Sequence, residues 1–216
     1  MILVIGNNNY SSWSMRPWLA MRQFDVEFEE VRLSLDSPGF ATDIAAYSAA
    51  GKVPVLVHQN RSVWDSLAIC EYVAELHPSA SMWPVGDVAR AQARSVSAEM
   101  HSGFASLRRQ LPMNCRATGR TVKLDESTRA AIQRIEIIWS QCLTSASREG
   151  PYLFGKFSIA DAMYAPVVSR FSTYGIELGE VARDYMAVIR DLPAYRDWLR
   201  DATAEPESLP WDEVEL

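Results

Sequence analysis

The sequence contains few cysteines, no excess of basic charge and no long apolar run, and each shortage excludes a class of protein. Its 216 residues include three cysteines, Cys70, Cys115 and Cys142. They are too widely spaced for a metal knuckle or a CxxC motif, and an odd number argues against a disulfide framework. We therefore expect no metal site and a reducing, cytoplasmic location.

Basic charge is scarce and scattered. The formal net charge is −6, and the Lys and Arg residues form no stripe or cluster. This distribution argues against nucleic acid as a partner and against direct adsorption to a membrane. No run approaches the roughly 18 apolar residues of a membrane span, and the first residues lead into a strand without the basic and apolar regions of an export signal. We expect neither a membrane segment nor export.

The first third of the chain alternates between strand and helix signals, which is typical of an α/β layer. Two short strand patterns flank Gln59-Asn60-Arg61 and predict an antiparallel hairpin, so a mixed four-stranded sheet is expected. The predicted strands are residues 2–5, 27–33, 54–58 and 62–64, and the predicted helices are 14–24, 38–47 and 66–77.

The remainder of the sequence is predicted to be helical. His77-Pro78 ends the third helix, and residues 79–86 are punctuated by Pro, Gly and Ser as in a linker. We predict an α/β domain over 1–78, a linker over 79–86 and an all-α bundle over 87–216. The apolar residues at helical spacing are Ala91, Val96, Met100, Phe104, Leu107 and Leu111, then Ile132, Ile135, Trp139 and Leu143.

The segment from Tyr10 to Leu19 predicts a site for a small anion. Pro17 is tolerated in the opening turn of a helix, which places the helix start near Ser14 and leaves Ser11 and Ser12 just outside it. A helix N-terminus offers free N–H donors and about half a positive charge, both of which favour an anion. A serine hydroxyl adds one directed donor.

Two further segments combine a backbone irregularity with polar groups. Pro54 cannot donate to a sheet ladder, so it marks an edge strand, a bend or a cis peptide, and a bend would leave the backbone of Val53 free for a ligand. Asp65 could accept from an ammonium group, while Ser66 is predicted to cap a helix whose N-terminus suits a carboxylate. The pair matches an amino-acid head group, with plain helix capping as the simpler alternative.

These segments, in this order, resemble the cytosolic glutathione transferase family. The resemblance implies a thioredoxin-like N-terminal domain, an all-α C-terminal domain and a homodimer. Four motifs carry it: the serine motif of the zeta and tau classes at Ser11–Arg16, the cis-proline loop at Gly51–Leu56, the acidic-residue-plus-Ser motif at Asp65–Ile69, and a C-terminal capping box at Gly155–Asp161. In that box Ser158 and Asp161 have the spacing of a structural cap.

The resemblance also implies roles for particular residues. Ser11, five positions before Arg16, is the first choice for the hydroxyl that activates the thiol, with Ser12 second and Tyr10 a further alternative. The residues implied for glutathione are Lys52 for a carboxylate, Val53 beside Pro54 for the cysteinyl backbone, and Asp65 with Ser66 for the glutamyl end.

Two positions depart from the family pattern. Asp65 replaces the commoner Glu and has a shorter reach, and Trp13 stands where Cys is frequent, which narrows the pocket and argues against a zeta-type isomerase. We expect the electrophile pocket to be lined by Trp13 and by one helix that carries Met100, His101, Phe104 and Arg108. Met100 and Phe104 equally suit a core, and Arg108 with Arg109 would suit an acidic substrate or a solvated helix face.

The implied chemistry must keep a thiol ionised at neutral pH. Free cysteine has a pKa of roughly 8.5, and serine is too weak a base to remove its proton. A serine hydroxyl that donates to sulfur, helped by a helix N-terminus, can supply the roughly 2.7 kcal/mol that lowers this pKa by about two units. We therefore predict a glutathione transferase in which the thiolate attacks a small hydrophobic electrophile. A glutathione-dependent isomerase or peroxidase on the same site, and a non-catalytic binding protein that shares the glutathione transferase fold, are the alternatives.

Overall fold

The computed structural model describes residues 1–144 and 149–213. A four-stranded sheet holds β1 (Ile2–Ile5), β2 (Glu29–Arg32), β3 (Val55–His58) and β4 (Arg61–Trp64) in the order β2-β1-β3-β4. β1 runs parallel to β2 and antiparallel to β3, and β3 is antiparallel to β4. The predicted mixed four-stranded sheet is confirmed.

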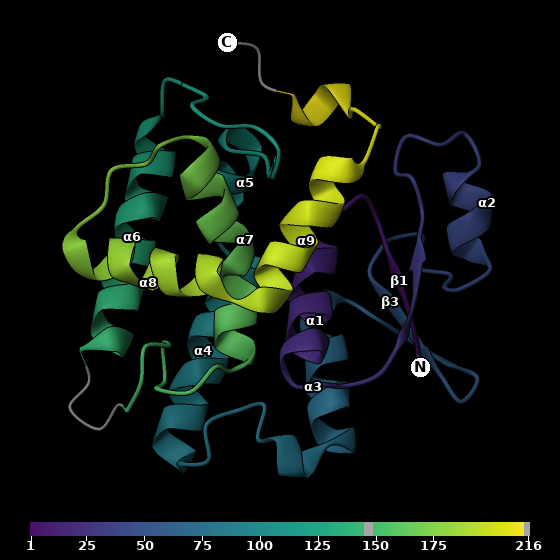
Figure 1. Ribbon diagram of the computed structural model, residues 1–216, viewed down its shortest axis with the longest axis horizontal. Coiled ribbons are helices and arrows are strands. Elements are labelled where there is room, and N and C mark those ends of the chain that lie inside the picture. The colour runs from purple at the N-terminus through teal and green to yellow at the C-terminus, as the bar shows by residue number, and fades with distance from the viewer. Residues whose placement is uncertain (145–148, 214–216) are drawn as a thin grey trace.

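Alternation along β1 sends side chains into two apolar layers. Leu3 and Ile5 face the main core, whereas Val4 packs with Ile44 and Val55 on the opposite face. Figure 1 shows the sheet between α2 on one side and α1 with α3 on the other. The helices of this part are α1 (Ser12–Gln23), α2 (Phe40–Ala45) and α3 (Ser66–Leu76).

The rest of the described chain is helical, and α7 forms its centre. Almost every residue of α7 is buried, and it packs against α1 and α4. The helices are α4 (Asp87–Ser102), α5 (Ala105–Gln110), α6 (Glu126–Leu143), α7 (Ile159–Thr173), α8 (Glu180–Asp191) and α9 (Pro193–Ala204), with short 3₁₀ helices at Pro78–Ala80 and Pro210–Asp212. Within the described residues, no helix is long and apolar enough to cross a membrane.

Local signals account for several turns and caps. Gln59 and Asn60 both have positive φ and form the two-residue turn between β3 and β4. Asp161 accepts from the backbone N–H of Ser158 at 2.9 Å, which completes the predicted capping box at the start of α7. The capping box was predicted from its residue types, and the predicted hairpin is confirmed, although its turn has two residues and not the three expected at Gln59-Asn60-Arg61.

Of the three alternatives for Pro54, the structure shows the cis peptide, at Val53–Pro54, and not an edge strand, because β3 lies between β1 and β4. Two other local predictions are wrong. Helix α1 begins at Ser12, so Pro17 lies in its second turn. Met100 and Arg108 do not share a helix, because α4 ends before Gly103 and Phe104 adopts a left-handed φ of 58°.

Candidate functional site

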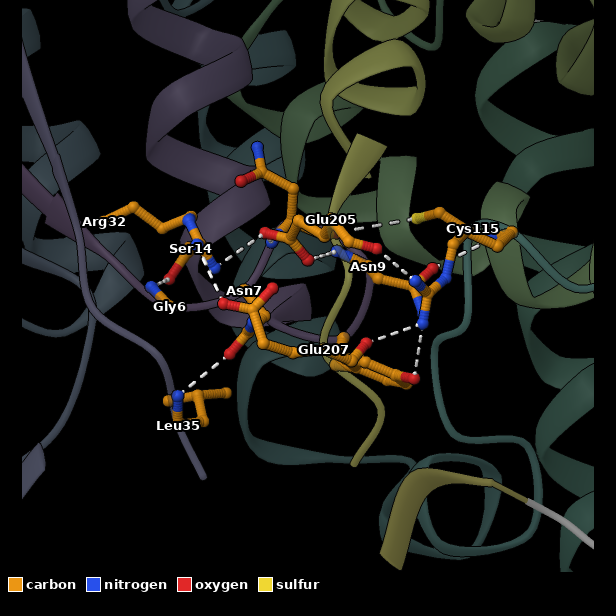
Figure 2. A network of polar contacts seen from close by, with 12 residues as sticks. Gly6, Asn7, Asn9, Ser14, Arg32, Leu35, Cys115, Glu205 and Glu207 are labelled. Atoms are coloured by element: carbon orange, nitrogen blue, oxygen red, sulfur yellow. Dashed lines mark hydrogen bonds and ion pairs between the residues drawn. The ribbon is translucent and has the colours of Figure 1, made fainter. Parts of the chain in front are cut away.

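The loop between β1 and α1 places two serines differently. Ser11 is the N-cap of α1: its Oγ accepts from the Ser14 N–H at 3.4 Å and donates to Ser14 Oγ at 2.7 Å. The Gly6 N–H in turn donates to Ser14 Oγ at 3.1 Å, a contact visible in Figure 2. Ser11 therefore lies outside the helix as predicted, whereas Ser12 is the first residue of α1.

The Ser12 hydroxyl accepts a hydrogen bond from an arginine of the C-terminal helical region. The guanidinium of Arg170, in the last turn of α7, donates from Nη2 to Ser12 Oγ at 2.9 Å and from Nη1 to the carbonyl of Leu111 at 2.5 Å. Burial lowers the pKa of Arg170 to about 10, so the group remains charged at neutral pH. A positive charge thus lies directly behind the Ser12 hydroxyl.

A cavity of about 380 Å³ opens beside the N-terminus of α1. We call it the serine cavity. Both serines face it, together with Trp13 and charged side chains from four separate parts of the chain. The residues that matter for its chemistry are Ser11, Ser12, Lys52, Arg108, Arg170 and Asp212.

A second hollow of about 510 Å³ shares Trp13, Lys52 and Val53 with the serine cavity. We call it the Asp65 hollow, and its other walls include Pro54, Asp65 and Ser66. The structure therefore gathers all five residues predicted for glutathione around one hollow. The two spaces adjoin at Val53, the residue implied for the cysteinyl backbone.

Asp65 holds the start of α3. It is the N-cap, with φ of 78°, and its Oδ1 accepts from the N–H groups of Leu67 at 3.0 Å and Ala68 at 3.3 Å. Its Oδ2 lies 3.1 Å from Nε2 of His101. The predicted cap at Ser66 is wrong, because Ser66 is already the first residue of the helix; Ser66 Oγ accepts from Arg16 Nη1 at 3.4 Å.

Trp13 lies among cationic and aromatic groups. The Arg16 guanidinium lies 4.2 Å and that of Arg108 5.3 Å from its ring centre, and the His101 ring packs edge-on at 5.3 Å. Burial is the main cause that lowers the pKa of Arg16, to about 9, so this arginine also stays charged at neutral pH. Burial likewise lowers the pKa of Arg108.

The residues predicted for the electrophile pocket are distributed unevenly. Trp13 and Arg108 line the serine cavity. Met100 is buried in the core, Phe104 packs against that core, and His101 lies beside Asp65. Only part of the predicted electrophile set therefore faces the cavity.

Tyr10, the alternative hydroxyl, also lines the serine cavity, but its OH group is engaged by other side chains. Its OH donates to Glu213 at 2.6 Å and accepts from Arg116 at 2.9 Å. Both partners belong to a network that ties the C-terminal segment to the loop after β1. This engagement leaves the Tyr10 hydroxyl without a free proton for a ligand.

Sequence reasoning missed Arg170 and Asp212. Arg170 lies near the end of a helix whose residues are almost all buried, and a charged residue in such a helix is a signal that could have been followed. Asp212 offers no comparable signal, because it lies in a short acidic segment near the end of the chain. No group of three or more His, Cys, Asp or Glu suited to a metal occurs within residues 1–144 and 149–213.

Comparisons with known protein families point in one direction. The family model described as glutathione S-transferase, N-terminal domain, matches residues 10–76, and the glutathione S-transferase, C-terminal domain, model matches residues 89–201. A probable maleylacetoacetate isomerase of Caenorhabditis elegans is 33% identical over 96 residues, 44% of each chain. The chloroplastic glutathione S-transferase L2 of Arabidopsis thaliana is 31% identical over 161 residues, 74% of this chain and 50% of that protein. The chain thus spans about half the length of these curated relatives.

Solved structures share the whole fold. A glutathione transferase homolog from Burkholderia, with bound glutathione, has a TM-score of 0.72 at 22% identity and covers 93% of this chain and 97% of its own. The holo structure of a bacterial zeta-class maleyl pyruvate isomerase has a TM-score of 0.71 at 21% identity, over 97% of this chain and 100% of its own. At this identity the likeness concerns the fold.

Proposed function

Because the chain belongs to the glutathione S-transferase family, we propose that it is a glutathione transferase whose serine-stabilised thiolate attacks a small hydrophobic electrophile. The observation that carries the proposal is the junction of two spaces. The serine cavity, at the N-terminus of α1, adjoins the Asp65 hollow at Val53. A tripeptide in the hollow would place its central sulfur at the cavity.

The charges around the Asp65 hollow suit the two ends of glutathione. The Asp65 carboxylate complements the glutamyl ammonium, while Ser66 and the N-terminus of α3 complement the glutamyl carboxylate. Lys52 complements the glycyl carboxylate, and the backbone of Val53 faces the cysteinyl residue. Glutathione is thus the co-substrate that we propose.

The chemical step asks the protein to stabilise charge. The glutathione thiol releases its proton to solvent, and a serine hydroxyl at the start of α1 donates a hydrogen bond to the resulting sulfur anion. The sulfur then forms a bond to the electrophilic carbon, and the leaving group departs with its electron pair. Binding in adjoining spaces supplies proximity.

Calorimetry with glutathione and a conjugation assay test this proposal together. We expect saturable glutathione binding, conjugation of a halonitroarene and a slower reaction with an organic hydroperoxide. The Lys52→Ala variant should weaken glutathione binding, whereas Lys123→Ala, on a loop outside both spaces, should leave it unchanged. Absence of binding would favour the non-catalytic alternative, and a faster hydroperoxide reaction would favour a peroxidase.

One observation favours a second candidate, a glutathione-dependent isomerase of an acidic substrate. Lys52, Arg108 and Arg170 line the serine cavity, and Asp212 is the only carboxylate among its described lining residues. Such a surplus of positive charge suits a carboxylate. In an isomerase the thiolate adds to a conjugated double bond, the carbon skeleton rotates, and the thiolate leaves again, so glutathione is not consumed. Turnover of a cis-configured unsaturated diacid without loss of glutathione would select this candidate over the transferase.

We also propose a homodimer, a cytoplasmic location, a role in detoxification and a division into the parts 1–78 and 87–216. The family likeness supports the dimer and the division. Three free cysteines support a reducing compartment. Sedimentation of the purified protein tests the dimer directly, since a single species at the monomer mass would contradict it.

A further inference from the structure

The Ser12 hydroxyl has one strong partner in the described structure, and that partner is a cation. Arg170 Nη2 donates to Ser12 Oγ at 2.9 Å. A guanidinium has five N–H donors and no acceptor, so the serine oxygen must accept this hydrogen bond. The hydroxyl proton of Ser12 is consequently free to point away from Arg170, and Ser12 lines the serine cavity.

The charge of Arg170 is held in place and is not neutralised. Its side chain is 4% exposed, and its two hydrogen bonds go to a serine hydroxyl and a backbone carbonyl. No carboxylate of the described residues lies within 4.0 Å of its nitrogens; Asp212 shares the cavity and interacts with it over a longer range. A buried cation without a paired anion has its effect on whatever charge enters next to it.

Ser11 is placed differently. Its proton is directed at Ser14 Oγ, and its own oxygen accepts from the Ser14 N–H as the helix cap. Ser14 Oγ is held by the Gly6 N–H, which fixes this arrangement from behind. The Ser11 hydroxyl therefore serves the local structure of the loop.

From this geometry we propose that Ser12 is the hydroxyl that donates to the glutathione sulfur, and that Arg170 is its positioning residue. The inference rests on the proposed function and deepens it. Arg170 turns the Ser12 proton toward the cavity and polarises the O–H bond, because it withdraws electron density from the oxygen. Its positive charge also favours the thiolate over the thiol. A residue of the C-terminal helical region thereby completes a site built on α1.

The pKa of the bound glutathione thiol tests this assignment. It is read from the ultraviolet absorbance of the thiolate in the glutathione complex as pH is varied. We expect Ser12→Ala to raise this pKa by about one unit, which is a tenfold decrease in the ionisation constant of the bound thiol. Arg170→Met should raise it by a similar amount, and Arg170→Lys, which restores the charge, should recover part of the loss. Ser11→Ala should cause a smaller rise than Ser12→Ala.

A double-mutant cycle separates positioning from general stability. If Arg170 acts through Ser12, adding Arg170→Met to Ser12→Ala will raise the thiol pKa less than Arg170→Met alone does. Arg183→Met is the matched control, because Arg183 also donates to a backbone carbonyl, at 2.5 Å, but faces neither cavity. It should leave the thiol pKa unchanged. If Arg170→Met does not fold, the same comparison is made with Arg170→Lys and Ser12→Ala, both of which keep a residue of similar shape.

The outcomes distinguish the two proposals. If the unaltered protein does not bind glutathione, the proposed function fails. If it binds glutathione with a depressed thiol pKa, yet Ser12→Ala leaves that pKa in place or Ser11→Ala raises it more, only the assignment to Ser12 fails. Equal effects of Arg170→Met with and without the Ser12 hydroxyl would remove Arg170 as its positioning residue.

Discussion

Asp161 is a fully buried carboxylate that organises the start of α7. It accepts from the N–H groups of Leu153 at 3.0 Å and Ser158 at 2.9 Å, and from the hydroxyls of Ser158 at 3.0 Å and Tyr185 at 3.1 Å. These donors favour the charged form, but loss of hydration outweighs them and raises the pKa of Asp161 to about 6. The folded protein therefore binds this proton more tightly than the unfolded chain does.

The raised pKa of Asp161 predicts a stability that falls as pH rises. Between pH 4 and pH 6 the folded state keeps a proton that the unfolded state has lost, so the free energy of unfolding decreases across this window. Over this range we expect the free energy of unfolding to fall by about 2 to 3 kcal/mol more in the unaltered protein than in Asp161→Asn. Urea unfolding at several pH values measures the difference.

Asp125 is the matched control, because its shift has the opposite sign. It caps α6 on the surface, and the hydrogen bond from the Thr128 N–H is the main cause that lowers its pKa. Its contribution to stability is therefore present above the unfolded pKa and is lost as pH falls. Asp125→Asn should reduce the acid-side loss of stability without changing the slope between pH 4 and pH 6. If the free energy of unfolding changes with pH by the same slope in Asp161→Asn and in the unaltered protein, the raised pKa assigned to Asp161 is contradicted.

At the scale of an element, α3 depends on one residue for its start and for its proposed ligand. Asp65 caps the helix through Leu67 and Ala68, and it also faces the Asp65 hollow. Asn caps a helix about as well as Asp and tolerates positive φ, but it carries no charge. Asp65→Asn should therefore keep the stability of the protein and weaken glutathione binding.

The Asp65→Ala variant separates these two roles. It removes the cap as well as the charge, and we expect it to lower the free energy of unfolding by about 1 kcal/mol. Thermal unfolding and glutathione calorimetry on both variants make the comparison. Equal binding by Asp65→Asn and the unaltered protein would show that the carboxylate does not hold the glutamyl ammonium.

Element prediction from this sequence succeeded where a local rule was sufficient. The strand over residues 2–5 and the hairpin around Gln59 and Asn60 follow from local patterns, and both are observed. The break between α4 and α5 was missed because Met100, Phe104 and Leu107 keep helical spacing across it. Its cause is the extended backbone of Gly103, where a Cβ atom would come within 2.7 Å of the Glu99 carbonyl oxygen. Residue spacing does not encode that close approach.

The candidate site likewise has one part that local motifs predict and one part that depends on tertiary packing. The half that we propose for glutathione lies in contiguous motifs around Ser11, Val53 and Asp65, so the residue types and their order could be read directly. The other half of the site is tertiary. Arg170 and Asp212 reach the serine cavity only because α7 packs against α1 and the last segment returns across the loop after β1. No spacing rule connects such distant positions.

At the scale of the whole molecule, the end of the chain supports the loop that carries the serines. Glu205 follows α9, and its carboxylate accepts from the N–H groups of Asn8 at 2.6 Å and Asn9 at 3.0 Å. Arg32 donates to the same carboxylate at 3.4 Å, and Arg116 donates to the Glu205 carbonyl. Figure 2 shows this convergence of β2, the loop after β1 and the C-terminal segment.

Glu205→Ala should therefore lower the free energy of unfolding more than Glu207→Ala does. The variant leaves two buried N–H groups without an acceptor, and we expect a loss of about 2 to 4 kcal/mol, because each unmet buried donor costs about 1 to 3 kcal/mol. For a chain of this size, each kcal/mol lost from the free energy of unfolding lowers the midpoint of thermal unfolding by about 2 to 4 °C. Circular dichroism resolves such a shift easily. Glu207→Ala removes an ion pair of 2.8 Å with Arg32 at a site 24% exposed, and it should cost under about 1 kcal/mol. Since Glu205, unlike Glu207, accepts from the backbone just before Ser11, its loss should also weaken glutathione binding. Equal effects of the two variants would place the support elsewhere.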